Sequence, residues 1–351
     1  MPLVGREDPE GYVEDFVCTL ATCDVHQWGY VRYIPSFGGN LFFLVLIIIY
    51  AFAQIWLGIK YRTSSVCLCM LAGLGLECAG YIGRILLHNN PFYQPYFMLY
   101  LVSLTLGPVF FAAAIYLCLG RIVVIFGQDI SWLKPQTYTF VFVACDVLSL
   151  LIVAIGGVIA SIVPYTNQTM IDLGTNIMVA GLAIQVASLT AFTVIGTEFA
   201  LRVYKNKHRL NLACADIYTS RRFKLFLGGL TLATVCVFTR SVFRAVELSD
   251  GFTGHLANDE VSFMILDGAL IMIACGAFTL LHPGYCFTKA GWAAASYPFL
   301  KKSEKKIAQD EERNEKREAR KQTIREAKEM QLNGEPNVVL TVVKEGSENT
   351  T

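Results

Sequence analysis

Residues 38–59 read GGNLFFLVLIIIYAFAQIWLGI and contain no charged side chain. About 20 consecutive, mostly apolar residues are enough for a helix to cross the hydrocarbon core of a bilayer. Six later runs have a comparable length and character. The sequence therefore predicts an all-α, polytopic membrane bundle of seven transmembrane helices, at about 38–59, 64–87, 96–126, 138–163, 174–201, 223–247 and 260–281.

The composition of the whole chain agrees with this class. Of the 351 residues, 54% are hydrophobic and 16% are charged, and the mean hydropathy is +0.48. Soluble domains contain about 25% charged residues. Charge is concentrated near the C-terminus, where residues 301–331 hold eleven Lys or Arg and eight Asp or Glu. These features exclude a soluble enzyme, a fibrous protein and a disordered chain, and the net charge of +1 gives no sign of a nucleic-acid partner.

Basic residues between the predicted helices favour one side of the membrane. One set of loops contains Lys60, Arg62, Lys134 and six Lys or Arg between 202 and 222, whereas the loops 88–95, 164–173 and 248–259 contain none. Cytoplasmic loops carry the excess of Lys and Arg. We therefore predict an N-terminus outside and a C-terminus inside. The expected domains are an extracellular segment 1–37, a membrane domain 38–285 and a cytoplasmic charged tail 286–351.

Two features of the predicted outer side agree with this orientation. Cys18 and Cys23 lie in the polar segment before the first helix, where an oxidising compartment would allow a short-range disulfide. Asn167-Gln168-Thr169 is an N-glycosylation sequence that would face outward. The first 20 residues are acidic and do not have the pattern of a cleavable signal peptide.

Ionisable side chains inside the predicted helices are informative, because a charge at the bilayer centre costs roughly 2.5–3.5 kcal/mol. Glu77, Tyr81 and Arg84 are spaced so that they share one face of the second helix. The other candidates for a ligand-binding or transport path are Arg240, Arg244, Glu247 and Asp267, and a second tier comprises Tyr116, Arg121, Asp146 and Gln185.

Depth along each helix follows from a rise of about 1.5 Å per residue. Glu77 lies near the middle of the membrane, and together with Arg84, Arg240, Arg244, Glu247 and Asp267 in the outer half it forms an outer group of three acids and three bases. A second group, in the inner half, consists of Arg121, Asp146 and Glu198.

We expect the outer group to face the bundle interior and to pair, because an unpaired buried charge is costly. One interpretation is a structural lock between the second, sixth and seventh helices. The other is a polar chamber for a lipid head group, in which Glu77 and Asp267 meet a cationic amine and Arg240 or Arg244 meets a phosphate. Both can hold together.

These motifs resemble those of the fungal lipid-translocating exporter family. The resemblance rests on Glu77-x-x-Gly80-Tyr81-x-x-Arg84, on Gly107-Pro108, on Arg240-Ser241-x-Phe243-Arg244-x-x-Glu247 and on His282-Pro283-Gly284, and it covers about residues 35–285. It implies a seven-helix fungal protein of the plasma membrane, or of an internal membrane. It also implies lipids or amphiphilic toxic compounds, such as sphingoid bases or sterol-like amines, as ligands, with a contribution to resistance. It implies no catalytic residue.

Two function classes remain open. The first is an exporter of amphiphilic lipids, with Glu77 or Asp267 as candidate proton carriers, since no nucleotide-binding Gly-x-x-x-x-Gly-Lys-Ser/Thr loop is present. The second is a seven-helix receptor or sensor of lipid asymmetry that signals to a cytoplasmic partner through its tail. No cofactor is indicated. A metal site and an enzymatic function are also disfavoured, because none of the five histidines lies in the middle of a predicted helix.

Overall fold

The computed structural model describes residues 3–7, 13–17, 19–20, 22–127, 135–162, 168–206, 214–249, 254, 256–287, 292 and 322. The chain divides into two units, Met1–Tyr297 and Pro298–Thr351. Everything below concerns the first unit.

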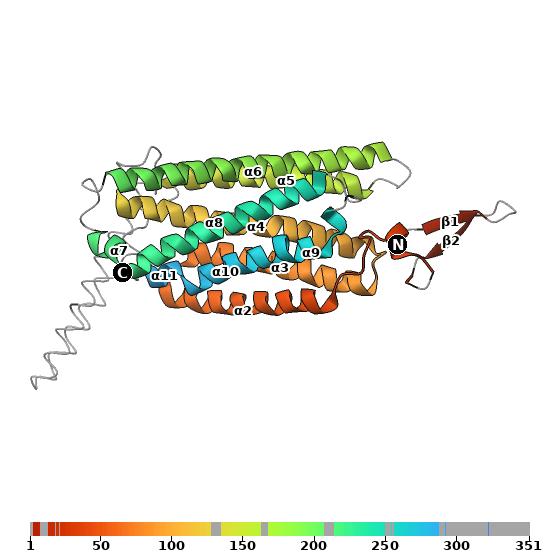
Figure 1. The fold of residues 1–351 in the computed structure, drawn as a ribbon, viewed down its shortest axis with the longest axis horizontal. Helices are drawn as coiled ribbons and strands as arrows, with labels where there is room; N and C mark the ends of the chain where they lie inside the picture. The colour runs from red at the N-terminus through yellow and green to blue at the C-terminus, as the bar shows by residue number, and fades with distance from the viewer. Residues whose placement is uncertain are drawn as a thin grey trace, which may run out of the picture. The chain divides into compact units, whose positions relative to one another are not determined.

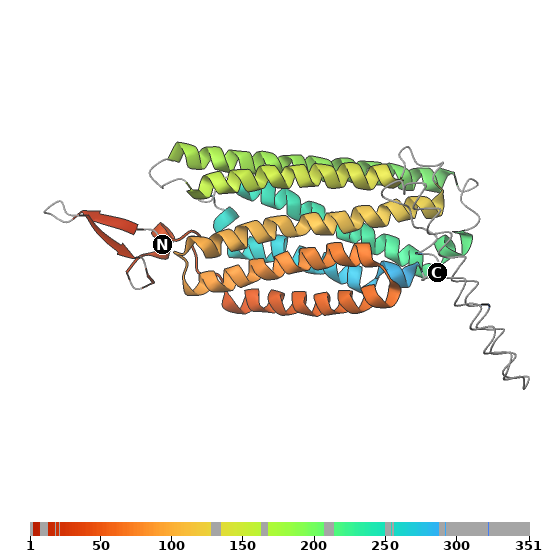
Figure 2. The same ribbon diagram turned by 180° about the vertical axis from the view of Figure 1, so that it is seen from behind.

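Seven segments of the described chain are long and apolar enough to cross a membrane. Their order along the chain and their packing side by side can be followed in Figures 1 and 2. They are α2 (Phe37–Tyr61), α3 (Ser64–Asn89), α4 (Gln94–Phe126), α5 (Pro135–Ile162), α6 (Gln168–Lys205), α8 (Arg221–Ser249) and a composite last span, Glu260–Cys286. The prediction of an all-α bundle with seven spans is confirmed. The largest difference is in α6, which begins six residues earlier and ends four residues later than predicted.

The last span is not a single α-helix. It consists of α9 (Glu260–Ser262), a π-helical segment η5 (Phe263–Ala269), α10 (Leu270–Leu280) and the short α11 (Pro283–Cys286). Seven residues of π-helix are unusual, because π-helices mostly occur as single turns within α-helices and often at functional sites. His282 is the N-cap of α11, where its Nδ1 accepts a hydrogen bond from the Gly284 N–H at 3.2 Å. The π segment contains Asp267, one of the predicted site residues.

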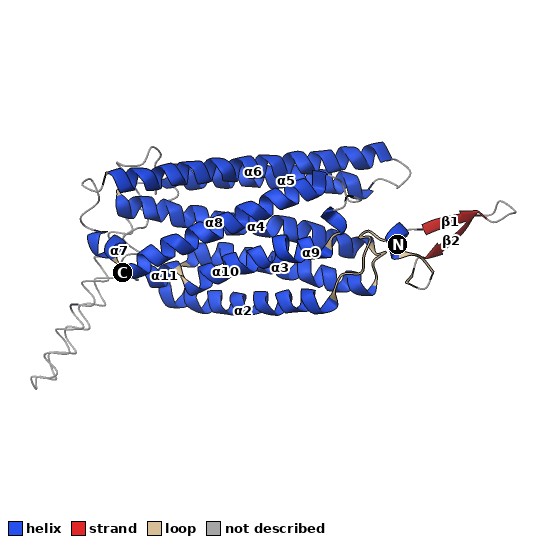
Figure 3. Ribbon diagram, viewed as in Figure 1, coloured by secondary structure: helices blue, strands red, loops and turns tan. Residues whose placement is uncertain are grey.

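Shorter elements lie between and before the spans. An antiparallel hairpin of β1 (Leu3–Glu7) and β2 (Val13–Val17), paired from Leu3↔Val17 to Glu7↔Val13, precedes α1 (Val25–Trp28). Figure 3 shows this hairpin in red against the blue helices. The helices α7 (Ala215–Thr219) and η4 (Leu256–Asn258) precede α8 and α9. The hairpin was not predicted.

Cys23 is disulfide-bonded, whereas Cys18 and Asn167 lie outside the described residues.

Glycines allow the spans to pack closely. A Cβ added to Gly156 on α5 would lie 2.6 Å from the carbonyl oxygen of Gly174 on α6. A Cβ added to Gly83 on α3 would lie 2.8 Å from the backbone nitrogen of Tyr100 on α4. Small residues favour association of membrane helices because they let the backbones approach. The result is two tightly packed pairs, α3 with α4 and α5 with α6.

The spans differ in how deeply they lie in the bundle. In the most apolar part of α4, 72% of the residues are buried, against 22% in α2. Helix α4 contacts α3, α5, α6 and α8, so it is the central helix. Polar groups that face α4 are therefore removed from both lipid and water.

Candidate functional site

A group of ionisable side chains meets in the interior of the bundle. Its members are at most 3% exposed and come from α3, α8 and η5. We call this group the buried charge cluster; it consists of Glu77, Arg240, Arg244, Glu247 and Asp267.

Arg240 is at the centre of the buried charge cluster. Its Nη2 lies 3.1 Å from Oε1 of Glu77, and its Nε lies 2.8 Å from Oδ1 of Asp267. The same Nη2 donates to the backbone carbonyl of Leu104 on α4 at 2.8 Å. This carbonyl has no i+4 N–H partner because that position is Pro108, which has no N–H. Arg240 thus lies within ion-pair distance of two carboxylates and donates a hydrogen bond to a backbone acceptor that the helix leaves free.

A glycine on α4 makes room for the Glu77 carboxylate. A Cβ added to Gly107 would lie 2.6 Å from Oε1 of Glu77, closer than any real Cβ contact. The Gly107-Pro108 pair therefore has two local effects: the glycine accommodates the carboxylate, and the proline exposes an acceptor for Arg240. Both depend on the close packing of α3 against α4.

Arg244 extends the cluster along α8. Its Nη1 lies 2.7 Å from Oε2 of Glu247, one turn further along the helix, and its Nε lies 3.7 Å from Oδ1 of Asp267. The cluster thus contains three carboxylates and two guanidinium groups. Oε2 of Glu77 has no hydrogen-bond partner. If every member is ionised, the cluster carries an excess negative charge.

Arg84 was predicted in the same group but pairs elsewhere. Its Nε donates to Oδ1 of Asn40 at 2.9 Å and its Nη2 to the hydroxyl of Tyr33 at 3.0 Å. Its Nη2 also lies 3.9 Å from Oε1 of Glu260, and its guanidinium carbon lies 3.7 Å from the centre of the Phe263 ring. Arg84 therefore joins α3 to α2 and to the start of the last span.

The environment of Arg84 contains residues that the sequence did not single out as site residues. Burial raises the pKa of Tyr33 to about 12, so its hydroxyl stays neutral beside the guanidinium. Oε1 of Glu260 also accepts the backbone N–H of Ser36 at 2.5 Å. The signals were present in the sequence: Asn40 is one of the few polar side chains in the first apolar run, and Glu260 begins the last one.

Tyr81 lies where predicted, on the buried face of α3. Its side chain is fully buried, its ring packs against Phe43 at 5.5 Å between ring centres, and its hydroxyl has no hydrogen-bond partner. A Cβ added to Gly268 would lie 3.0 Å from this hydroxyl. Tyr81 thus contacts the π segment next to Asp267.

The inner-half residues do not form the single group that was predicted. The hydroxyl of Tyr116 donates to Oδ2 of Asp146 at 2.9 Å. Arg121 instead donates to the backbone carbonyl of Trp292 at 2.6 Å, with its guanidinium over the indole ring. Glu198 forms a partly exposed pair with Arg202 at 2.7 Å, one turn away on α6. Gln185 is buried on α6, and its Oε1 has no hydrogen-bond partner. The depth of these residues in the membrane did not identify their partners, because side chains at the same depth can face different helices.

No group of three or more His, Cys, Asp or Glu side chains arranged to hold a metal ion occurs in the part of the chain that the structure describes.

Comparison with known proteins gives relatives with transport-related names. Over 261 residues, the chain is 31% identical to the sphingoid long-chain base transporter RSB1 of Saccharomyces cerevisiae, covering 67% of this chain and 66% of that protein. It is 26% identical to Protein RTA1 of the same yeast over 72% of this chain and 85% of the relative. It is 29% identical to the yeast protoporphyrin uptake protein 1 over 59% and 65% of the two chains.

The aligned part thus spans about two thirds of the length of the sphingoid base transporter. No solved structure matches the chain. Residues 70–290 match the family described as RTA1 like protein, and this region contains the whole buried charge cluster. The resemblance to fungal lipid-translocating exporters is confirmed. More than half of the chain lies within this match, and the protein therefore belongs to the RTA1-like family of multi-pass membrane proteins.

Proposed function

We propose that this protein transports amphiphilic, lipid-like compounds with a cationic head group across a membrane, and that it is not an enzyme. The observation that carries the proposal is the excess carboxylate in the buried charge cluster. Three carboxylates share two arginines, and Oε2 of Glu77 has no hydrogen-bond partner. A cationic amine at Glu77 would balance the charge and donate a hydrogen bond to Oε2.

Head-group binding in this cluster requires an exchange of ion pairs. Arg240 already contacts Glu77, Asp267 and the Leu104 carbonyl. An amine that enters at Glu77 would release this carboxylate from Arg240, and Arg240 would keep Asp267 as its partner. The exchange leaves no buried charge unpaired, which is the condition for a low energetic cost.

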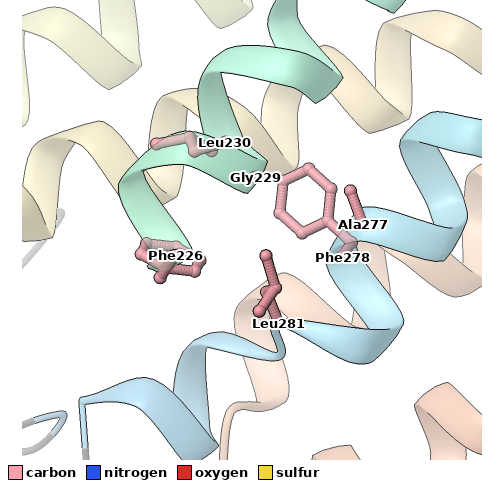
Figure 4. Close-up of a pocket in the computed structure, with 6 residues that line it drawn as sticks. All are labelled: Phe226, Gly229, Leu230, Ala277, Phe278 and Leu281. Carbon is pink, nitrogen blue, oxygen red and sulfur yellow. The ribbon is translucent and has the colours of Figure 1, made fainter. Parts of the chain in front are cut away.

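An open groove of about 720 Å³ on the outside of the bundle offers a place for the apolar chain. Tyr50 of α2 contributes to it, and the two other walls come from α8 and α10. The residues of these walls are mainly apolar or small, and they include Leu225, Gly228, Leu232, Ile273, Gly276 and Leu280. Figure 4 shows a smaller pocket between α8 and α10, which Phe226, Leu230 and Phe278 help to line and which shares Gly229, Ala277 and Leu281 with the groove.

Along α8 and along the last span, the groove lies next to the buried charge cluster. From Leu232 at the end of the groove to Arg240 is about 12 Å along α8, at about 1.5 Å per residue. A bound amphiphile could therefore keep its chain against α8 and α10 while its head group reaches towards the cluster. The names of the yeast relatives, a sphingoid long-chain base transporter and a protoporphyrin uptake protein, support a lipid-like cargo.

The test uses purified protein in liposomes that contain a fluorescent sphingoid base. Leaflet exchange is timed for the wild type, for Glu77→Gln and for the control Glu198→Gln, whose carboxylate lies in a partly exposed pair. We expect exchange faster than in empty liposomes with the wild type and the control, and a loss of at least tenfold with Glu77→Gln. Size-exclusion chromatography checks that each variant is folded.

Two results would contradict the proposal. Saturable binding without exchange would favour the sensor of lipid asymmetry, for which the charged tail would contact a cytoplasmic partner. The absence of both binding and exchange would exclude this ligand class.

We propose the plasma membrane as the location of the protein, which fluorescence imaging of a tagged protein can test.

A further inference from the structure

A second buried polar site lies between α4, α5 and α6. Asp146 on α5 is 2% exposed, and its Oδ2 accepts a hydrogen bond from the Tyr116 hydroxyl on α4 at 2.9 Å. The rings of Phe142 and Phe192 pack around Tyr116, with centres 5.7 and 4.4 Å from its own. The carboxyl group is therefore enclosed by aromatic side chains and separated from solvent.

Asp146 differs from the other buried acids in having no cationic partner. Glu77, Asp267 and Glu247 each lie within ion-pair distance of Arg240 or Arg244. Within the described part of the chain, no Lys, Arg or His lies within ion-pair distance of Asp146. The side chains beside its carboxyl group are Tyr116 and Ser188, and Cys145 lies near Tyr116.

Unpartnered polar atoms of α6 lie on the side of Asp146. Gly181 faces Ser149 and Val153 on α5, and these two helices pack closely. Gln185 and Ser188 follow Gly181 by one and two turns on the same face of α6, which places them level with Asp146 on the antiparallel α5. Ser188 is a neighbour of both Tyr116 and Asp146. Oε1 of Gln185, Oγ of Ser188 and Oδ1 of Asp146 are all buried without a hydrogen-bond partner.

This arrangement lacks a positive charge, and among the three unpartnered atoms only Oγ of Ser188, beside Asp146, carries a hydrogen that it can donate. Two of the three unpartnered atoms, Oδ1 of Asp146 and Oε1 of Gln185, can only accept hydrogen bonds when the carboxylate is ionised. An unpaired carboxylate in this position is costly. A proton on Oδ1 would remove the charge and supply a donor. A divalent cation would require about six oxygen ligands, more than the unpartnered atoms provide.

We propose that Asp146 is a proton-binding site, protonated in the conformation described here. Binding forms one O–H bond at Oδ1 and breaks one O–H bond of a hydronium ion from the solvent, which leaves water. If the transport function proposed above holds, release and uptake of this proton couple transport to a proton gradient. The sequence favoured Glu77 or Asp267 for this role, but both carboxylates lie against Arg240.

Infrared spectroscopy tests the proton directly and does not depend on transport. Spectra of the purified protein at neutral pH are compared between the wild type and Asp146→Asn. We expect the variant to lose intensity in the C=O stretching band of a protonated carboxylic acid. Glu198→Gln is the control, because its carboxyl group lies in a partly exposed pair with Arg202 and its substitution should leave the protonated band unchanged.

A loss of carboxylate intensity in Asp146→Asn, with the protonated band unchanged, would overturn the proposal. So would a protonated band that disappears when sodium replaces potassium in the buffer, since this would show a metal-cation site. If Asp146→Asn does not fold, Tyr116→Phe takes its place: it removes the hydrogen bond to Oδ2 and should shift the band. An unshifted band would also overturn the proposal.

Coupling is tested separately in the liposome assay. Asp146→Asn, which cannot release a proton, should abolish the dependence of exchange on a pH gradient. If the wild type shows no exchange, the transport function fails while the infrared result for the proton site still stands. A gradient dependence that remains in the variant would contradict the coupling role alone.

Discussion

At the scale of single residues, Arg240 has the largest number of partners in the buried charge cluster. Its guanidinium contacts Glu77, Asp267 and the Leu104 carbonyl, and it is fully buried. A buried ion pair often contributes little net stability compared with apolar side chains, but removal of one partner leaves the other charges uncompensated and costs about 3–5 kcal/mol. The two interpretations of the cluster therefore differ in what a substitution at Arg240 should do.

We predict that Arg240→Met lowers the free energy of unfolding by about 3–5 kcal/mol, because it leaves Glu77 without a cationic partner and Asp267 with only the 3.7 Å contact to Arg244. Chemical unfolding in mixed micelles measures this loss. The control Glu198→Gln, in a half-exposed pair, should change stability by at most about 1 kcal/mol. Combining Arg240→Met with Glu77→Gln and Asp267→Asn should recover part of the loss. Equal stability of Arg240→Met and the control would show that the cluster is not a structural lock.

At the scale of elements, the packing of α3 against α4 holds Glu77 beside Arg240. Gly107 lies where a side chain would collide with the Glu77 carboxylate, while Gly75 on α3 is exposed, and a Cβ added there meets nothing within 4 Å. The π segment η5 places Asp267 against α8 from the other side. The buried charge cluster thus depends on two local features: the absence of a side chain at Gly107 and the π-helical geometry of η5.

We predict that Gly107→Ala destabilises the protein by about 1–3 kcal/mol, because the added methyl group overpacks the site and displaces the carboxylate. Gly75→Ala is the matched control. It adds the same methyl group to a helix without a clash and should be neutral or stabilising by up to about 1 kcal/mol. Thermal unfolding of both variants in the same detergent gives the comparison. A smaller loss for Gly107→Ala than for Gly75→Ala would contradict this account of the glycine.

At the scale of the whole molecule, orientation in the membrane follows from charge. Lys and Arg are abundant in one set of loops and absent from most of the other. We predict that an epitope tag before residue 1 is accessible to antibody on intact cells, and that a tag after residue 351 is accessible only after permeabilisation. The reverse pattern would place the buried charge cluster nearer to the cytoplasmic surface and would change the direction in which a head group enters.

The seven spans could be predicted from the sequence because of a strong local constraint. A backbone in lipid must satisfy its own hydrogen bonds, so each apolar run of sufficient length forms a helix. The face that Glu77, Tyr81 and Arg84 share on α3 was also predictable, because helical periodicity alone determines it. The hairpin before α1 was not, since its residues carry no comparable constraint.

The pairing of the charged residues was decided by the tertiary structure. Arg84 is partnered by Glu260 and Asn40, and not by the acids of its own helix or of the cluster. The Leu104 carbonyl that Arg240 binds is a backbone atom, and Asp267 reaches Arg240 from a π segment. Composition and spacing showed which residues are buried in the membrane. Their partners depend on helix rotation and tilt, which close packing between neighbouring helices determines and which no single segment specifies.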